Sequence, residues 1–202
     1  MKILFSPTSP FVRKCLVSAH ELGLAERIEL LPSNAHPVNR DAAIVAVNPL
    51  GKVPTFFADD GTVLYDSRVI CEYLDDLAGG GRLFPRSGPA RWTALRLQAL
   101  ADGVLEAALL ARYEEVARPE GLRWPDWRRA QLDKAHTTLQ ALDGDAGSLA
   151  GRVDIGTLSL ACMLWYLDLR FAELGWRERY PAVAAWAQDF GRRPSLQASW
   201  AL

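Results

Sequence analysis

Two short motifs in the first third of the chain carry groups that could bind a small peptide. The first covers residues 48–54 and reads Asn-Pro-Leu-Gly-Lys-Val-Pro, and the second, Asp66-Ser67, begins twelve residues later. The Val53–Pro54 bond is a candidate for the cis isomer, which would leave the Val53 N–H and C=O free to pair with an extended ligand. Asp66-Ser67 precedes a helix, whose free N–H groups favour a carboxylate. Either motif alone is also common as a turn or a cap, but their order and spacing together favour a site for a small acidic peptide.

Ser9 stands directly before Pro10, at the predicted start of a helix over residues 10–23. A serine at this position is a favoured helix cap, worth about 1 kcal/mol over alanine. The same hydroxyl could donate a hydrogen bond to a bound thiolate, which the helix terminus also favours. Lowering the pKa of a thiol by about two units requires about 2.7 kcal/mol, which is within reach of such a donor and a helix end. Capping and thiolate binding both remain open for Ser9.

The remaining pattern of the first 78 residues predicts a mixed α/β domain with the element order βαβαββα. A first strand–helix–strand unit predicts parallel strands, and the Asp59-Asp60-Gly61 turn predicts an antiparallel hairpin. Strands are expected at 2–5 and 26–31 and on each side of that turn, and helices at 10–23, 40–47 and 67–77.

Glycine and proline then interrupt the pattern. Gly79-Gly80-Gly81 and the prolines that follow predict a linker over residues 79–88, which separates a domain at 1–78 from an all-helical domain at 89–202. Helices are expected at 89–117, 125–142, 154–173, 181–190 and 194–199. Asp168 and Arg170 interrupt the apolar 154–173 segment, so a buried core helix is favoured there over a membrane span.

Composition excludes several classes of partner. The 23 basic and 24 acidic residues nearly cancel, so no nucleic-acid partner is expected. No stretch of 18 apolar residues exists, so no membrane span is expected. Cys15, Cys71 and Cys162 are odd in number and widely spaced, which favours a reducing cytoplasm over a disulfide framework. None of the three histidines lies near a cysteine at ligand spacing, so no metal site is expected.

These motifs carry a family resemblance. With Ser-Pro-Phe-Val-Arg-Lys at residues 9–14, the motif at 48–54 and Asp66-Ser67, the chain resembles the cytosolic glutathione S-transferases over nearly its full length, and most of all a bacterial branch that has Ser-Pro-Phe-Val-Arg-Lys near its start. The resemblance implies a thioredoxin-like N-terminal domain followed by the all-helical domain. It further implies a cytoplasmic, homodimeric detoxification enzyme that needs no metal, uses glutathione as co-substrate and attacks a small hydrophobic electrophile.

The resemblance also implies a role for each glutathione-site residue. Ser9 would face the glutathione sulfur, and Val53 would pair its backbone with the cysteinyl unit before a cis Pro54. Asp66 and Ser67 would hold the γ-glutamyl head, Ser67 through its hydroxyl and backbone N–H.

Further positions follow with less support from the motifs. Lys52 would meet the glycyl carboxylate, and Asn34, after the second strand, is a weaker candidate for the same end. Arg13 would support the first turn of its helix from within the fold. The second-substrate pocket would form between Phe11 and residues 109–113, with Trp165 or Trp200 as further candidates. Arg68, Arg91 and Trp92 supply charge and aromatic surface for a dimer interface.

Two departures from the family pattern stand out. Residues 9–12 contain no cysteine, which excludes a glutaredoxin-type dithiol mechanism, and Cys15 is expected to be a buried apolar residue. The long apolar helix is preceded by Gly151-Arg152-Val153-Asp154, where the family often has Ser or Thr three residues before the Asp. Gly151 is expected to cap in place of that residue, and Asp154 to accept from backbone N–H groups.

Three functions are compatible with these residues. The leading hypothesis is a transferase that activates the glutathione thiol for attack on an apolar electrophile. A glutathione-dependent peroxidase or disulfide reductase is an alternative that keeps the same site. A non-catalytic binding protein with the same fold is the third, and the presence of Ser9, Lys52, Asp66 and Ser67 argues against it, because a scaffold needs no ligand site.

Overall fold

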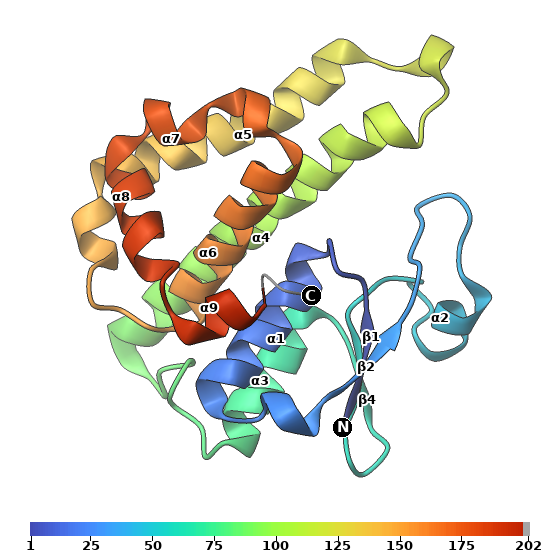
Figure 1. Ribbon diagram of the computed structural model, residues 1–202, viewed down its shortest axis with the longest axis vertical. Coiled ribbons are helices and arrows are strands. Elements are labelled where there is room, and N and C mark those ends of the chain that lie inside the picture. The colour runs from blue at the N-terminus through green and yellow to red at the C-terminus, as the bar shows by residue number, and fades with distance from the viewer. Residues whose placement is uncertain (200–202) are drawn as a thin grey trace.

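The computed structural model describes residues 1–199, and its first half is built on a four-stranded mixed sheet (Figure 1). The strand order is β2-β1-β3-β4, with β1 parallel to β2 and antiparallel to β3, which is antiparallel to β4. Strand bounds are Lys2–Phe5 for β1, Glu29–Pro32 for β2, Thr55–Phe57 for β3 and Val63–Leu64 for β4. The predicted topology is confirmed, but β2 begins three residues late, because Ala25–Arg27 forms a 3-10 turn instead.

Three helices surround this sheet. Helices α1 (Pro10–Leu22) and α3 (Ser67–Leu77) cover one face, and α2 (Ala42–Val47) lies on the opposite side (Figure 1). Helix α1 ends at Gly23, whose φ of 74° lets its N–H bond back to carbonyls of the last turn. The thioredoxin-like domain expected from the sequence is thus confirmed.

The second half is helical. Helices α4, α5 and α6 are the long ones, and α4 packs against both of the others. Their bounds, with those of the shorter helices, are Gly88–Val116 (α4), Pro125–Gly144 (α5), Ile155–Arg170 (α6), Trp176–Arg179 (α7), Pro181–Phe190 (α8) and Pro194–Ala198 (α9). Helix α6 ends three residues before the expected position, because the chain bends at Phe171 into a 3-10 turn, and α7 was not expected at all.

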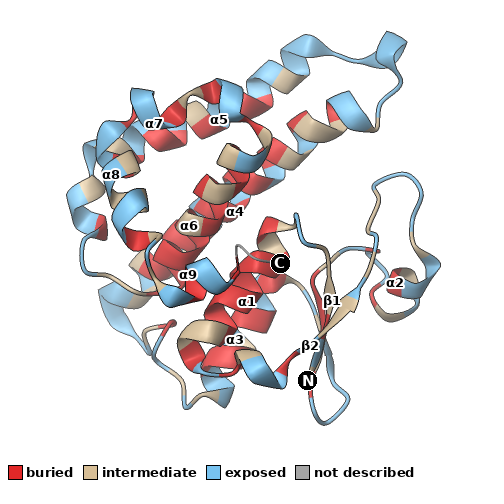
Figure 2. Ribbon diagram, viewed as in Figure 1, coloured by how far each residue is buried: buried red, intermediate tan, exposed pale blue. Residues whose placement is uncertain are grey.

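Helix α6 contributes to both hydrophobic cores of the molecule. Ile155, Leu158 and Cys162 belong to the core between the sheet, α1 and α3. Met163 and Leu167 belong to the core formed with α4, α5 and α8. Figure 2 accordingly shows α6 as buried along most of its length, like α1. The predicted buried character of this helix is confirmed.

The start of α6 differs from the expectation in one respect. Asp154, not Gly151, is the N-cap: its carboxylate accepts from the N–H groups of Gly156 at 2.9 Å and Thr157 at 3.1 Å. The Thr157 hydroxyl accepts in turn from the Asp154 N–H at 3.0 Å, which completes a capping box. Gly151, at φ 69°, lies in the loop before the cap, so the expected glycine cap is wrong.

Buried polar contacts join the two halves. The Lys14 ammonium, fully buried in α1, donates to the Asp102 carboxylate of α4 at 2.7 and 2.8 Å. The Arg13 guanidinium donates to the carbonyls of Leu196 and Ser199 at the end of the chain. Arg13 is therefore structural, as expected, but these two hydrogen bonds join α1 to the end of α9 and do not support the first turn of α1.

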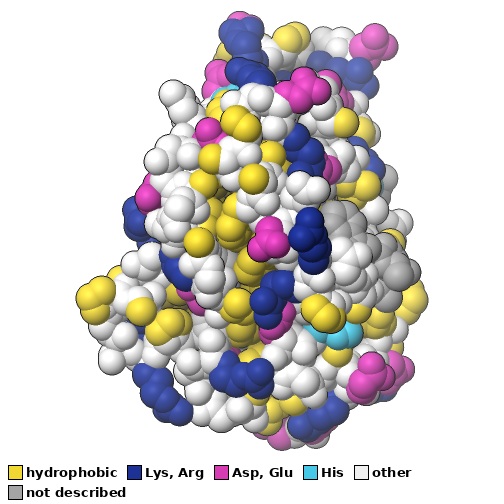
Figure 3. Space-filling view, turned by 60° about the vertical axis from the view of Figure 1, so that its left-hand side comes forward, with side chains coloured by type: hydrophobic (Ala, Val, Ile, Leu, Met, Phe, Trp, Pro, Cys, Tyr) yellow, Lys and Arg dark blue, Asp and Glu magenta, His cyan; other side chains and the backbone are white. Residues whose placement is uncertain are grey.

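On the surface, charges of both signs are interspersed, as the face in Figure 3 shows. No single helix among residues 1–199 combines the length and apolar character that a membrane crossing requires, although α6 together with the Ala172–Arg179 segment meets those two criteria as a pair bent by 97°. In the same part of the chain, no group of three or more His, Cys, Asp or Glu side chains is placed to hold a metal ion.

Candidate functional site

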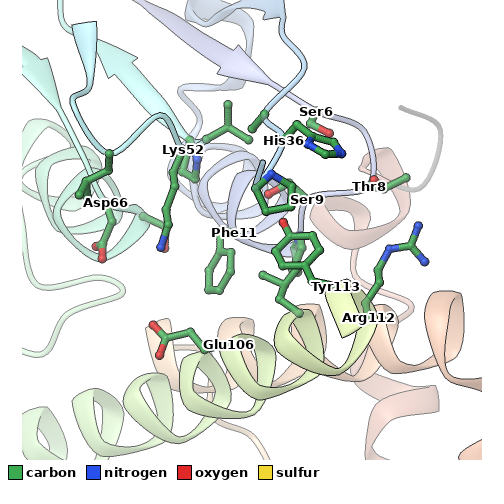
Figure 4. A pocket seen from close by; sticks show the side chains of 18 of the residues that line it. Ser6, Thr8, Ser9, Phe11, His36, Lys52, Asp66, Glu106, Arg112 and Tyr113 are labelled. Carbon is green, nitrogen blue, oxygen red and sulfur yellow. The ribbon is translucent and has the colours of Figure 1, made fainter. Parts of the chain in front are cut away.

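A cavity of about 600 Å³ lies between the two halves of the molecule (Figure 4). One wall comes from the loop before α1, the loops around β2 and β3 and the start of α3, and the other from the inner face of α4 with the end of α6. All six site residues expected from the sequence line this cavity: Ser9, Asn34, Lys52, Val53, Asp66 and Ser67.

The Ser9 hydroxyl caps α1 and still has a donor to offer. Its oxygen accepts from the Val12 N–H at 3.3 Å. Because a hydroxyl has two acceptor lone pairs and one O–H, this bond leaves the proton free to point into the cavity. Capping and thiolate binding are therefore compatible functions of one side chain.

The loop before β3 presents an unpaired stretch of backbone. Asn48, which is 1% exposed, donates to the Lys52 carbonyl at 3.1 Å and to the Thr55 hydroxyl at 3.0 Å, which holds the loop in shape. The Val53–Pro54 bond is cis, as expected. The backbone N–H and C=O of Val53 have no hydrogen-bond partner within residues 1–199, so an extended ligand could pair with them.

The start of α3 combines charges of both signs. The Asp66 carboxylate accepts from the Arg68 N–H at 3.0 Å and pairs with the Arg68 guanidinium at 2.7 Å. That guanidinium is the main cause of a lowered pKa for Asp66, which keeps the carboxylate ionised. Ser67, the first residue of α3, is 2% exposed and lines the cavity. This corner offers an anion, a cation and a helix N-terminus within one turn.

Helix α4 supplies the opposite wall by its helical period. Asp102, Glu106, Leu109, Tyr113 and Val116 recur every three or four residues, and all line the cavity. Such residues share one face of a helix. Of the expected stretch 109–113, Leu109, Leu110, Arg112 and Tyr113 line the cavity together with Phe11, and their contact with a second substrate stays a prediction.

The aromatic residue expected from α6 is a different one. Trp165 lies under the Arg13 guanidinium, 4.4 Å from it, and is not among the described residues that line the cavity. Its neighbour Tyr166 lines the cavity instead, because adjacent residues of a helix face different sides. Trp200 lies outside the described residues.

Sequence reasoning missed several charged lining residues, namely Arg68, Asp102, Glu106 and Arg170, and it did not single out Arg112 within the expected stretch 109–113. Glu106 is spaced from Asp102 and Leu109 so that all three share one face of a helix. Such a face is more often packed in a core than exposed to a binding pocket, so the spacing alone did not predict a lining role for Glu106. Arg170 gave no signal, because nothing in the sequence shows that the end of α6 approaches α4.

Comparison with known proteins matches both halves. The family model for the glutathione S-transferase N-terminal domain matches residues 8–77, and the one for the C-terminal domain matches residues 125–189. The uncharacterised GST-like protein YibF of Escherichia coli K12 is 32% identical, with 97% of this chain and 96% of the relative covered. Glutathione S-transferase A of Pleuronectes platessa is 27% identical over 99% of this chain and 91% of the relative.

Solved structures agree over the full length. A glutathione transferase family member from Pseudomonas fluorescens Pf-5 with bound glutathione is 45% identical, with a TM-score of 0.95 over 98% of this chain and 97% of that one. A second structure from the same organism, with bound S-(propanoic acid)-glutathione, is 43% identical with a TM-score of 0.89 over 98% of both chains. Both family domains match in order, relatives align along nearly the whole chain and the cavity lies where the domains meet, so the chain belongs to the glutathione S-transferase family.

Proposed function

We propose that the protein is a glutathione S-transferase that activates the glutathione thiol for attack on a small electrophile with an apolar body. The observation that carries this proposal is the Ser9 hydroxyl, which caps α1 through its oxygen and keeps its proton available at the cavity wall. The glutathione and the glutathione thioether bound in the two Pseudomonas structures support glutathione as the co-substrate.

In this proposal, glutathione lies along the N-terminal wall. The γ-glutamyl head is a zwitterion, and the α3 corner has matching groups: Asp66 for its ammonium, and Arg68 with the Ser67 hydroxyl and N–H for its carboxylate. The cysteinyl unit pairs with the Val53 backbone, as an added strand would. Lys52, with Asn34 nearby, meets the glycyl carboxylate. The sulfur then faces Ser9.

The chemistry is one displacement at the electrophile. The thiol proton leaves to solvent, and the Ser9 O–H donates to the thiolate, lowering the pKa of the bound thiol. The sulfur lone pair forms a bond to carbon while the leaving group departs with its bonding pair. Phe11, Leu109 and Leu110 supply apolar contacts for the electrophile.

The reacting thiol belongs to glutathione in this proposal, not to the protein. Cys15, Cys71 and Cys162 are all fully buried and free. Burial raises the pKa of the Cys162 thiol to about 12 and is the main cause of the raised pKa of Cys15. None of the three lines the cavity, so a mixed disulfide with the protein has no place in the cycle.

The ultraviolet thiolate absorbance of bound glutathione across pH tests this proposal. We expect a thiol pKa lowered by about two units from its usual value near 8.5. An unshifted pKa would instead support the non-catalytic binding protein. Mass spectrometry of the products with an aryl halide or a hydroperoxide then separates a thioether adduct from oxidised glutathione, the product of a peroxidase or reductase.

The same proposal includes a homodimer, membership of the bacterial branch of the family and a cytoplasmic location. Exposed Val69 of α3 and Trp92 of α4, beside the Arg91–Glu72 ion pair, would form a two-fold interface between copies of the chain. Light scattering should then give twice the 22.3 kDa chain mass, and a stable monomer at micromolar concentration would contradict the dimer. The motif at residues 9–14 supports the bacterial branch, and the three free cysteines support the cytoplasm.

A further inference from the structure

The end of the cavity beyond Ser9 carries positive charge. Arg112 of α4 and Arg170 at the end of α6 both line the cavity, together with Tyr113 and Tyr166. In Figure 4, Arg112 lies on the opposite side of Ser9 from Asp66, and Tyr113 lies beside Ser9. Burial raises the pKa of Tyr166 to about 12, and the guanidiniums of Arg112 and Arg170 both oppose that rise, so both lie close enough to act on one phenol.

Neither guanidinium has a hydrogen bond or ion pair within residues 1–199, and the Arg170 Nε is buried without a partner. The carboxylates nearest to them along α4 and α6 are engaged elsewhere. Glu114 pairs with Arg118 at 2.8 Å, and Glu115 pairs with Arg128 at 2.7 Å. Asp168 of α6 pairs with Arg177 at 2.7 Å, and Glu173, just after α6, also pairs with Arg128. Among residues 1–199, nothing therefore competes with a ligand for Arg112 and Arg170.

The acidic residues of the cavity serve its other end. Asp102 is paired with the buried Lys14. With Glu106 it contributes to the raised pKa of Arg68, for which the hydrogen bond to Asp66 is the main cause. In Figure 4, Glu106 likewise lies nearer to Asp66 than Arg112 does. A ligand group that extends past the sulfur thus meets two cations and two phenols.

We propose that the electrophile of this enzyme carries a carboxylate, which Arg112 and Arg170 bind on the far side of Ser9. This inference rests on the proposed function, because it assigns the glutathione sulfur to Ser9. Guanidiniums form charge-assisted hydrogen bonds to carboxylates in a fork geometry, and tyrosine hydroxyls can donate further ones. The apolar residues between Ser9 and this end would hold the body of the electrophile, so the expected substrate is amphipathic.

Binding of two matched glutathione conjugates tests the inference without any need for turnover. S-(4-carboxybenzyl)glutathione and S-(4-carbamoylbenzyl)glutathione differ only in one charged group. In titration calorimetry we expect the acid to bind about tenfold more tightly than the amide, as for a hydrogen bond to a charged group. The preference should weaken as salt is raised. Equal affinities in the wild-type protein would overturn the inference, and this comparison requires no variant.

Arg112→Gln and Arg170→Gln should each reduce the preference for the acid and leave the affinity for the amide nearly unchanged. Arg129→Gln, which removes an exposed arginine of α5 outside the cavity, is the control and should keep the full preference. If the cavity variants weaken glutathione and both conjugates equally, the arginines hold the glycyl carboxylate and the inference is wrong.

Rates separate this inference from the proposed function. With 4-chloro-3,5-dinitrobenzoate and its amide, each normalised to the uncatalysed reaction with glutathione, kcat/KM should favour the acid about tenfold. If the protein binds the acid conjugate selectively but forms no adduct with either compound, the carboxylate site is supported and the proposed transferase activity is contradicted. If the protein binds neither conjugate, both the carboxylate site and the proposed transferase activity are contradicted.

Discussion

The Ser9 hydroxyl combines a structural bond with a proposed chemical one, and substitutions can separate them. Ser9→Ala should lower turnover with glutathione by about tenfold or more, because a donor to the thiolate is lost, while KM for glutathione changes little. Ser9→Gly is the matched comparison: glycine caps nearly as well as serine but has no hydroxyl. Steady-state kinetics should show both variants impaired, with the larger loss of thermal stability in the alanine variant. Wild-type turnover in both would move the role to Thr8 or Ser6, or to backbone amides alone.

Ser67→Ala should have the opposite kinetic effect. It removes one donor to the γ-glutamyl carboxylate, so KM for glutathione should rise about tenfold, while turnover at saturation stays near the wild-type value. Ser87→Ala is the control, since Ser87 is an exposed residue before α4 whose side chain makes no cap bond. Wild-type glutathione affinity of Ser67→Ala in titration calorimetry would place the γ-glutamyl head elsewhere.

At the scale of elements, the close approach of α4 and α6 depends on one glycine. A Cβ at Gly156 would lie 2.7 Å from the Ala94 carbonyl oxygen and 2.7 Å from the Leu97 Cβ, both on α4. Gly156→Ala should therefore lower the free energy of unfolding by about 1–3 kcal/mol, because a backbone atom must move to make room. Urea unfolding measures this directly.

Gly103→Ala provides the matched control within α4. Gly103 has no heavy atom within 4 Å of an added Cβ and lies in the helix interior, so alanine should raise the free energy of unfolding by about 0.4–1 kcal/mol. Opposite signs for the two Gly→Ala changes support the packing argument. A neutral Gly156→Ala would show that the two helices have room to separate.

How far the sequence predicted the elements depends on whether the signal was local. Ser9 and Gly23 mark both ends of α1 through cap chemistry, and the Asp59-Asp60-Gly61 turn marks the hairpin, so all were predictable. Helix α7 was not, because four residues hold too little periodicity to detect. The family pattern predicts the cap of α6 at Gly151, whereas the local pair Asp154 and Thr157 forms the capping box.

The residues of the candidate site also fall into two groups, those that a local motif predicts and those that only tertiary packing brings together. The residues of the N-terminal wall belong to short motifs, and the structure brings them together. Arg112 and Arg170 are 58 residues apart in the sequence and meet only because α4 and α6 pack side by side. That packing is a tertiary property, which no local pattern encodes.

At the scale of the whole molecule, Glu21 of α1 links the first half to the last helix. Its carboxylate accepts from the Arg193 guanidinium at 2.8 Å and from the Ser195 hydroxyl. The hydrogen bond from Arg193 is the main cause of the lowered pKa of Glu21. A carboxyl whose pKa is lowered on folding stabilises the fold above its unfolded pKa, about 4.3, and loses that contribution as the pH falls through its folded value.

Glu21→Gln should therefore lower stability more at pH 7 than at acid pH. The difference between wild type and variant in the free energy of unfolding, measured with urea, should be constant from pH 7 to about pH 5 and shrink below about pH 4. Glu26→Gln, on the exposed turn after α1, is the control with little effect at pH 7. A Glu21→Gln difference that stays constant down to pH 3 would show that the pair contributes by shape and not by charge.

Because α6 contributes to both cores, neither half can unfold without exposing apolar surface on the other. Amide protection in β1 and in α4 should therefore disappear at the same denaturant concentration, although the chain divides into two halves by sequence. The first half alone would lack the Ile155, Leu158 and Cys162 side chains that complete its core. Its folding thus depends on a segment that begins 78 residues after the end of α3, so during synthesis the sheet with α1 and α3 must wait for α6 before it becomes stable.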